Sequence, residues 1–173
     1  LRTIGDWAFH ACTGLQSVTL PEGLTTIKQK AFNKTALTSV TIPASVTYIG
    51  YNAFTDCSPL TSVTMNIIDP TTLSLDASAF PSGMTIYVSD VDPWNARFPN
   101  ASNYNYNFRE MPFTSWTSGD TDVKFYNNGE MIISKKAGDG NGAMADYENK
   151  SDRPWNNNDV KKVVFKSGVT TIG

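Results

Sequence analysis

The chain has 173 residues, of which 40% are hydrophobic and 17% charged, and its formal net charge is -2. This length fits one or two domains, and the hydrophobic fraction is enough to form a core. The near-neutral charge and the single histidine argue against nucleic-acid binding, which needs a concentrated basic face. No apolar run approaches the length of a membrane span, so no membrane insertion is predicted.

A motif of 22 or 23 residues recurs in the first 65 residues. Its clearest copy, residues 37–59, reads LTSVTIPASVTYIGYNAFTDCSP, and residues 15–36 read LQSVTLPEGLTTIKQKAFNKTA. Residues 1–14 supply the second half of an earlier copy, and residues 60–65 open a further one. A fixed period in this range predicts a solenoid of stacked repeats.

Each copy begins with a short alternating segment, which predicts half-buried strands at residues 17–20, 39–42 and 62–65. The Val and the Leu, Ile or Met of each segment are expected to face inward, and the Ser and Thr outward. Pro21 and Pro43 follow directly and end the strand, because proline cannot donate a hydrogen bond to a strand ladder.

The second half of each copy is expected to return to the core through two further apolar residues and an Ala-Phe pair. Gly5 and Gly50 suit a tight turn, so Lys28 at the same position indicates a different local backbone. No copy can bury its apolar face alone, so stacking creates the core. The Ala-Phe pairs are Ala8-Phe9, Ala31-Phe32 and Ala53-Phe54.

The pattern LxxVxLPxxVxxIGxxAFxxC, read here at residues 37–57, resembles the leucine-rich repeats of the BspA-like class. Such repeats are found in surface proteins of Bacteroides and related gut or oral bacteria, and in some parasites. The resemblance implies a mainly β fold, a leucine-rich-repeat solenoid with 22- to 23-residue repeats, β-rich caps and little helix. It also implies an extracellular or cell-surface location.

After Met65 the pattern weakens. The segment MTIYV predicts a strand, and a short helix is predicted after it, with Asp92 as N-cap and Pro93 at the first helical position. Trp94 and Phe98 would fall on one face of this helix. The run resembles the C-terminal cap of the bacterial repeat proteins, so residues 66–111 are predicted to form the last degenerate repeat and that cap.

Residues 112–173 are predicted to form a separate module. Asn128-Gly129 lies between two alternating apolar arms and predicts a β-hairpin. The closing stretch VKKVVFKSGVTTIG follows the repeat pattern again. The order of these segments resembles an N-terminal cap, so this module is predicted to hold a β-hairpin cap and the first strand of a following repeat array.

Both ends of the chain fall within a repeat, so we expect it to be a piece of a longer protein. Open repeat ends expose apolar residues and strand edges, which favours pairing with another chain. The sequence therefore predicts head-to-tail self-association. We hypothesise that residues 160–173 cover the open edge at Leu1, either from a neighbouring molecule or by folding back.

No catalytic, cofactor or metal site is predicted. Cys12 and Cys57 occupy the same repeat position two copies apart, a separation of roughly 10 Å that is too long for a disulfide, so both are expected to be small buried side chains. His10 alone offers too few ligands for a metal ion. The glycine-rich loop at residues 137–142 fails the EF-hand pattern, although a loose ion site there stays open. Its carboxylates are Asp139, Asp146 and Asp152.

The candidate ligand-binding residues lie on the outside. The outward strand positions form two predicted columns, which stabilise the sheet by cross-strand pairing or contact a protein or glycan. Three aromatic residues near the second turn either anchor a ligand or cover the edge. The columns are Ser17, Ser39 and Ser62, and Thr19, Thr41 and Thr64; the aromatic residues are Trp7, Tyr48 and Tyr51.

The resemblance implies a non-enzymatic, secreted or cell-surface module for adhesion or for binding a host or bacterial surface protein. Two alternatives are a carbohydrate-binding accessory of a gut bacterial glycan-utilisation system and a structural spacer. Because one fold serves many functions, this choice depends on family analogy.

Overall fold

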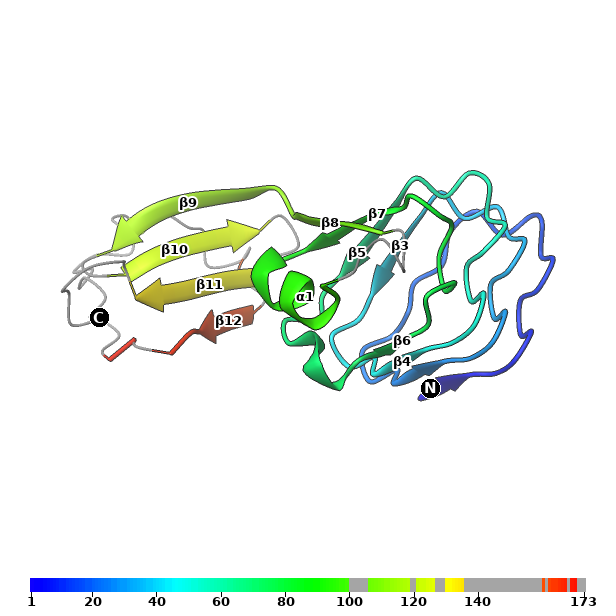
Figure 1. Cartoon of the computed structure of the whole chain (residues 1–173), viewed down its shortest axis with the longest axis horizontal. Coiled ribbons are helices and arrows are strands. Elements are labelled where there is room, and N and C mark those ends of the chain that lie inside the picture. The colour runs from blue at the N-terminus through cyan, green and yellow to red at the C-terminus, as the bar shows by residue number, and fades with distance from the viewer. Residues whose placement is uncertain are drawn as a thin grey trace. The chain divides into compact units, whose positions relative to one another are not determined.

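The computed structural model describes residues 1–99, 106–118, 121–126, 130–135, 160, 162–167 and 169–170. The chain divides into two compact units, residues 1–110 and 111–173. In the first unit the chain forms a coil of stacked turns, each of which adds a strand to one or both of two parallel sheets (Figure 1). The predicted mainly β solenoid with 22- to 23-residue repeats is therefore confirmed.

The two sheets of the first unit each hold four strands. The sheet order is β3-β5-β7-β8 in one and β1-β2-β4-β6 in the other. The parallel register pairs residues 22 or 23 positions apart, as in Thr3 with Thr26, Thr26 with Tyr48 and Ser39 with Ser62. The strands are β3 (Ser39–Ile42), β5 (Ser62–Met65), β7 (Thr85–Val88), β8 (Asn107–Glu110), β1 (Thr3–Ile4), β2 (Thr26–Ile27), β4 (Tyr48–Ile49) and β6 (Ser74–Leu75).

The core of the first unit contains a stack of aromatic rings, one from each turn. The rings of Phe9, Phe32, Phe54 and Phe80 lie face to face with centroid separations of 5.2, 5.1 and 5.1 Å. Tyr106 meets Phe80 edge-on at 5.8 Å. Since Ala31, Ala53 and Ala79 are fully buried beside the rings, the predicted interior role of the Ala-Phe pairs is confirmed for the inner turns.

Two positions of the repeat have a left-handed backbone that the sequence did not predict. One precedes the Ala-Phe pair and the other follows its Phe by two residues. Asparagine and aspartate tolerate this conformation, whereas it costs other L-residues about 1–2 kcal/mol. The residues are Trp7, Lys30 and Asn52 at the first position and Ala11, Lys34 and Asp56 at the second, with φ between 52° and 62°.

The first turn departs from two predictions. Residues 17–20 keep the expected alternation, with Leu20 buried and Ser17 and Thr19 exposed, but they form no strand. Among the described residues they have a neighbouring turn on one side alone, where the amide of Thr38 donates to Gln16 O at a long 3.4 Å. For the same reason Cys12 is exposed, whereas Cys57 is buried; both are free thiols.

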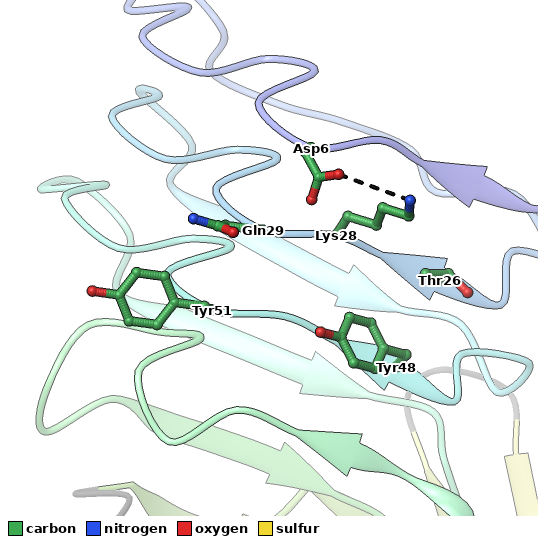
Figure 2. A pocket seen from close by; sticks show the side chains of 6 residues that line it. All are labelled: Asp6, Thr26, Lys28, Gln29, Tyr48 and Tyr51. Carbon is green, nitrogen blue, oxygen red and sulfur yellow. Dashed lines mark ion pairs between the residues drawn. The ribbon is translucent and has the colours of Figure 1, made fainter.

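The expectation of a different backbone at Lys28 is wrong. The amide of Lys28 donates to Ile4 O at 3.0 Å, and the amide of Gly50 donates to Ile27 O at 2.9 Å. The same bond therefore joins each pair of turns, and the Lys28 side chain is accommodated by pointing outward (Figure 2).

The last turns of the first unit contain a short 3₁₀ helix, Pro70–Thr72, and α1, Val91–Arg97. The strand predicted from MTIYV forms as β7. The helix N-cap is Asp90 and not the predicted Asp92, because the Asp90 carboxylate accepts from the amide of Asp92 at 3.2 Å. Trp94 and Phe98 are buried with ring centroids 6.0 Å apart, so their shared face is confirmed.

The described residues of the second unit form a four-stranded sheet, in the order β12-β11-β10-β9. Antiparallel pairing of β10 and β11 confirms the arms of the predicted hairpin, while Asn128-Gly129 and the Asp139, Asp146 and Asp152 carboxylates lie outside the described residues. The strands are β9 (Phe113–Ser118), β10 (Thr121–Tyr126), β11 (Glu130–Lys135) and β12 (Lys162–Phe165).

The closing strand β12 pairs in parallel with β11 of its own unit. Val163 and Phe165 lie in register with the buried Met131 and Ile133, yet their own side chains are exposed. The described part of the closing segment thus has a partner within its unit, and coverage of the Leu1 edge stays a prediction.

Candidate functional site

The first candidate surface is the outward face of the sheet β3-β5-β7-β8, which we call the hydroxyl face. Its register places Ser39 opposite Ser62 and Thr41 opposite Thr64, so four of the predicted binding residues lie together in two columns. The inward partners on the same strands, such as Val40 and Val63, are buried. Ser17 and Thr19 are exposed in the first turn but do not belong to a strand.

The two columns continue beyond the residues that the sequence analysis singled out. The register pairs Thr64 with Tyr87 and Tyr87 with Arg109, and it pairs Thr85 with Asn107. The alternation in the segment TIYV could have indicated Thr85 and Tyr87. Asn107 and Arg109 gave no such signal, because their strand does not follow the repeat motif.

The hydroxyl face is almost uncharged. Arg109 is the one charged side chain among its outward strand residues. Within the described part of the chain, the hydroxyls of Ser39, Thr41, Ser62 and Thr64 make no hydrogen bond to another protein group. Ser39 and Thr41 are exposed, Ser62 and Thr64 are half-buried, and the four hydroxyls do not bond to one another across the strands.

The second candidate surface is an open hollow of about 400 Å³ beside the other sheet, which we call the tyrosine hollow (Figure 2). Three successive turns build it, since its residues come from β2, β4 and the segments that follow β1, β2 and β4. Tyr48 and Tyr51 are 43% and 49% exposed. The lining residues are Asp6, Thr26, Lys28, Gln29, Tyr48 and Tyr51.

Gly50 makes room for the ring of Tyr48 within this hollow. A Cβ atom on Gly50 would lie 3.0 Å from Tyr48 Cε1 and 3.0 Å from the backbone nitrogen of Gln29. A side chain at position 50 would therefore require the Tyr48 ring or the neighbouring turn to shift by a few tenths of an ångström.

The Lys28 ammonium lies 3.8 Å from the Asp6 carboxylate, and both side chains are about half exposed. Such an exposed ion pair adds about 0–1 kcal/mol to stability. Its two groups also remain accessible to a ligand in the hollow.

Trp7 does not line the hollow. The Lys30 ammonium lies 4.3 Å from the centroid of its ring, and His10 packs against it edge-on at 4.6 Å. Of the three predicted aromatic residues, the structure thus brings Tyr48 and Tyr51 together and leaves Trp7 in a separate contact.

The described residues contain no group of three or more His, Cys, Asp or Glu side chains that could hold a metal ion. The buried thiol of Cys57 lies 3.2 Å from Thr35 Oγ1 and 3.1 Å from Phe32 O. It therefore packs against the preceding turn. No helix in the described ranges has the length and apolar character to cross a bilayer.

The sequence model of the BspA-type leucine-rich repeat region matches residues 1–90 of this chain in six copies. The match covers just over half of the 173 residues and includes strands β1 to β7, which carry the tyrosine hollow and most of the hydroxyl face. Neither a curated protein nor a solved structure matches the chain.

Proposed function

Because the chain belongs to the BspA-type leucine-rich repeat family, we propose that it is an extracellular or cell-surface module whose hydroxyl face binds a protein partner. The family is a repeat scaffold and not an enzyme family, so repeat-mediated protein binding is the function to expect of it. The proposal goes further than the family in naming the face and the location, and we propose adhesion as the role of this binding.

The observation that carries the proposal is the exposed parallel sheet with unpaired hydroxyls. Parallel sheets are usually covered on both faces, whereas the outward face of this one is open to solvent. Short Ser and Thr side chains lose less rotamer freedom on binding than long ones. Their hydroxyls both donate and accept, so a docked protein can satisfy them.

One edge of this face also offers the residue types that dominate binding energy at interfaces. Tyr87 and Arg109 are neighbours in one column, and Tyr and Arg are enriched among the residues whose truncation weakens complexes most. We infer that these two residues contribute most of the binding energy, while the Ser and Thr columns form additional hydrogen bonds with the partner. A host or bacterial surface protein is the partner we propose.

The test is binding of the whole chain to panels of purified host extracellular proteins and bacterial surface proteins, measured by surface plasmon resonance. We expect a saturable partner whose affinity falls at least about tenfold in Thr41→Lys and Thr64→Lys, because a long charged side chain blocks the face. Thr3→Lys is the matched control, since Thr3 is an exposed strand threonine of the other sheet.

Equal binding by all three variants would place the contact elsewhere and refute the proposed face. A chain that binds no protein but binds glycans would favour the accessory role in glycan use. A chain that binds neither, and whose deletion leaves the parent protein's binding intact, would favour the spacer.

Self-association is a separate proposal and has a separate test. If open repeat ends pair head to tail, light scattering after size exclusion should show dimers and larger species that grow with concentration. A constant monomer mass over the dilution series would refute it.

A further inference from the structure

The tyrosine hollow lies outside the hydroxyl face. Protein binding at the hydroxyl face therefore does not explain why the hollow is lined by tyrosine, lysine and aspartate side chains. Figure 2 shows Tyr48 and Tyr51 at separate places on one turn, Lys28 and Gln29 on the preceding turn, and Asp6 on the turn before that. Its volume of about 400 Å³ falls within the range of small-molecule sites, roughly 300–1,000 Å³.

In the part of the chain that the structure describes, the two tyrosine rings of the hollow have no aromatic partner. Within the described residues, neither Tyr48 nor Tyr51 stacks on another ring, and neither hydroxyl makes a hydrogen bond. Both rings are close to half exposed. A tyrosine held in this way offers an apolar ring face and a polar tip to a ligand.

The polar side chains of the hollow both donate and accept hydrogen bonds, and their charges balance. Lys28 supplies donors, Asp6 supplies acceptors, and the amide of Gln29 supplies both. The side-chain amide of Gln29 makes no hydrogen bond within the described ranges. One ammonium and one carboxylate lie 3.8 Å apart, so their charges cancel and the site suits a neutral ligand. Its donors and acceptors can form hydrogen bonds with several hydroxyl groups of such a ligand.

We propose that the tyrosine hollow binds a neutral pyranose ring of a glycan. The C–H face of the sugar packs on Tyr48 and Tyr51, and its hydroxyls bond to Asp6, Lys28 and Gln29. A pyranose has this combination of an apolar face and a rim of hydroxyls that donate and accept. The inference is independent of the proposed protein partner, since it uses a different surface.

The experiment titrates the full chain with methyl β-D-glucopyranoside, methyl β-D-galactopyranoside, methyl α-D-mannopyranoside and, as the charged comparison, methyl β-D-glucuronide. Saturation-transfer NMR reports which sugar protons touch the protein, and calorimetry gives the affinity. We expect at least one neutral glycoside to bind with a Kd of about 1 mM, as befits an open site and a small ligand. Saturation should be strongest at the ring C–H protons.

Variants then locate the site. Tyr48→Ala and Tyr51→Ala should each weaken binding about tenfold, whereas Tyr48→Phe, which keeps the ring, should retain most of it. Trp7→Ala is the matched control, because Trp7 is exposed to a similar degree (47%) but does not line the hollow. Far-UV circular dichroism and thermal unfolding verify that each variant is folded.

Three results would overturn the proposal: no saturable binding of any neutral glycoside, binding of the glucuronide alone, or binding that both tyrosine-to-alanine variants retain. A linear tetrasaccharide of the best glycoside distinguishes the source of the ligand. Tighter binding of the tetrasaccharide supports an internal sugar of a polysaccharide, and equal binding supports a terminal sugar.

Discussion

Phe9 and Phe54 occupy the same position of the repeat, yet Phe9 is 40% exposed and Phe54 is fully buried. The same contrast separates Cys12 from Cys57. The local sequence around these residues is similar; what differs is that an inner turn has neighbours on both sides. In a solenoid, burial is thus conferred by the adjacent turns, as expected when stability is a sum of nearest-neighbour terms.

The largest expected effect concerns thiol reactivity. Cys12 should react rapidly with a thiol reagent in the native chain, whereas Cys57 should react about a thousandfold more slowly, because it must wait for its turns to open. Quenched labelling followed by mass spectrometry of the peptides measures both rates. In denaturant the two rates should converge, and equal rates in the native chain would contradict the buried position of Cys57.

Truncation of the aromatic stack should show the same contrast in free energy. Phe54→Ala removes a ring held between Phe32 and Phe80 and should lower the free energy of unfolding by about 3–5 kcal/mol. Phe9→Ala, the matched control, should cost about 1 kcal/mol, because one face of its ring has no neighbour in the stack. Urea unfolding followed by circular dichroism measures both, and equal losses would mean that Phe9 is buried in solution.

A smaller effect is expected from a hydrogen bond between turns. The amide Nδ2 of the buried Asn33 donates to Thr55 O at 2.6 Å, so Asn33→Ala should lower the free energy of unfolding by about 1–2 kcal/mol. His10 holds the same position one turn earlier, where its Nδ1 has no partner in the described structure. His10→Ala should therefore change stability by about 0.5 kcal/mol or less.

The smallest effect should be a gain. Lys34 has a φ of 60°, a conformation that asparagine adopts more easily, so Lys34→Asn should raise the free energy of unfolding by about 0.5–1 kcal/mol. Lys28→Asn is the control, since Lys28 has no positive φ. This gain depends on the backbone of one turn and not on its neighbours. A loss in Lys34→Asn would show that the Lys34 side chain has a stabilising role of its own.

Much of the fold could be predicted from the sequence, because the repeat period and the alternation of apolar and polar residues can be recognised within a single repeat. The strands at residues 39–42 and 62–65, their inward Val, Ile and Met side chains and the interior Ala-Phe pairs of the inner turns are all present as predicted. The missing strand at residues 17–20 and the exposed Cys12 depend on which turns have neighbours. A repeat motif read one copy at a time does not contain that information.

The candidate sites were less accessible to sequence reasoning. Tyr48 and Tyr51 stood out as aromatic residues near the second turn of the repeat, but the hollow also needs Asp6 and Lys28, which lie one or two turns earlier in the chain. The contacts of Gly50 with the preceding turn also appear only when the turns are stacked. The left-handed positions were missed because Trp7, Lys30 and Lys34 are not residues that favour that conformation.

The hydrogen bonds that join one turn of the first unit to the next also determine how it would respond to a mechanical load. The bonds run between stacked strands, so a pull along the direction of stacking loads the turns in series and each interface bears the whole force. Rupture would begin at the weakest interface, and each released repeat of 22 residues would lengthen the chain by about 75 Å. Under tension the unit would yield in discrete steps, as an extensible tether does.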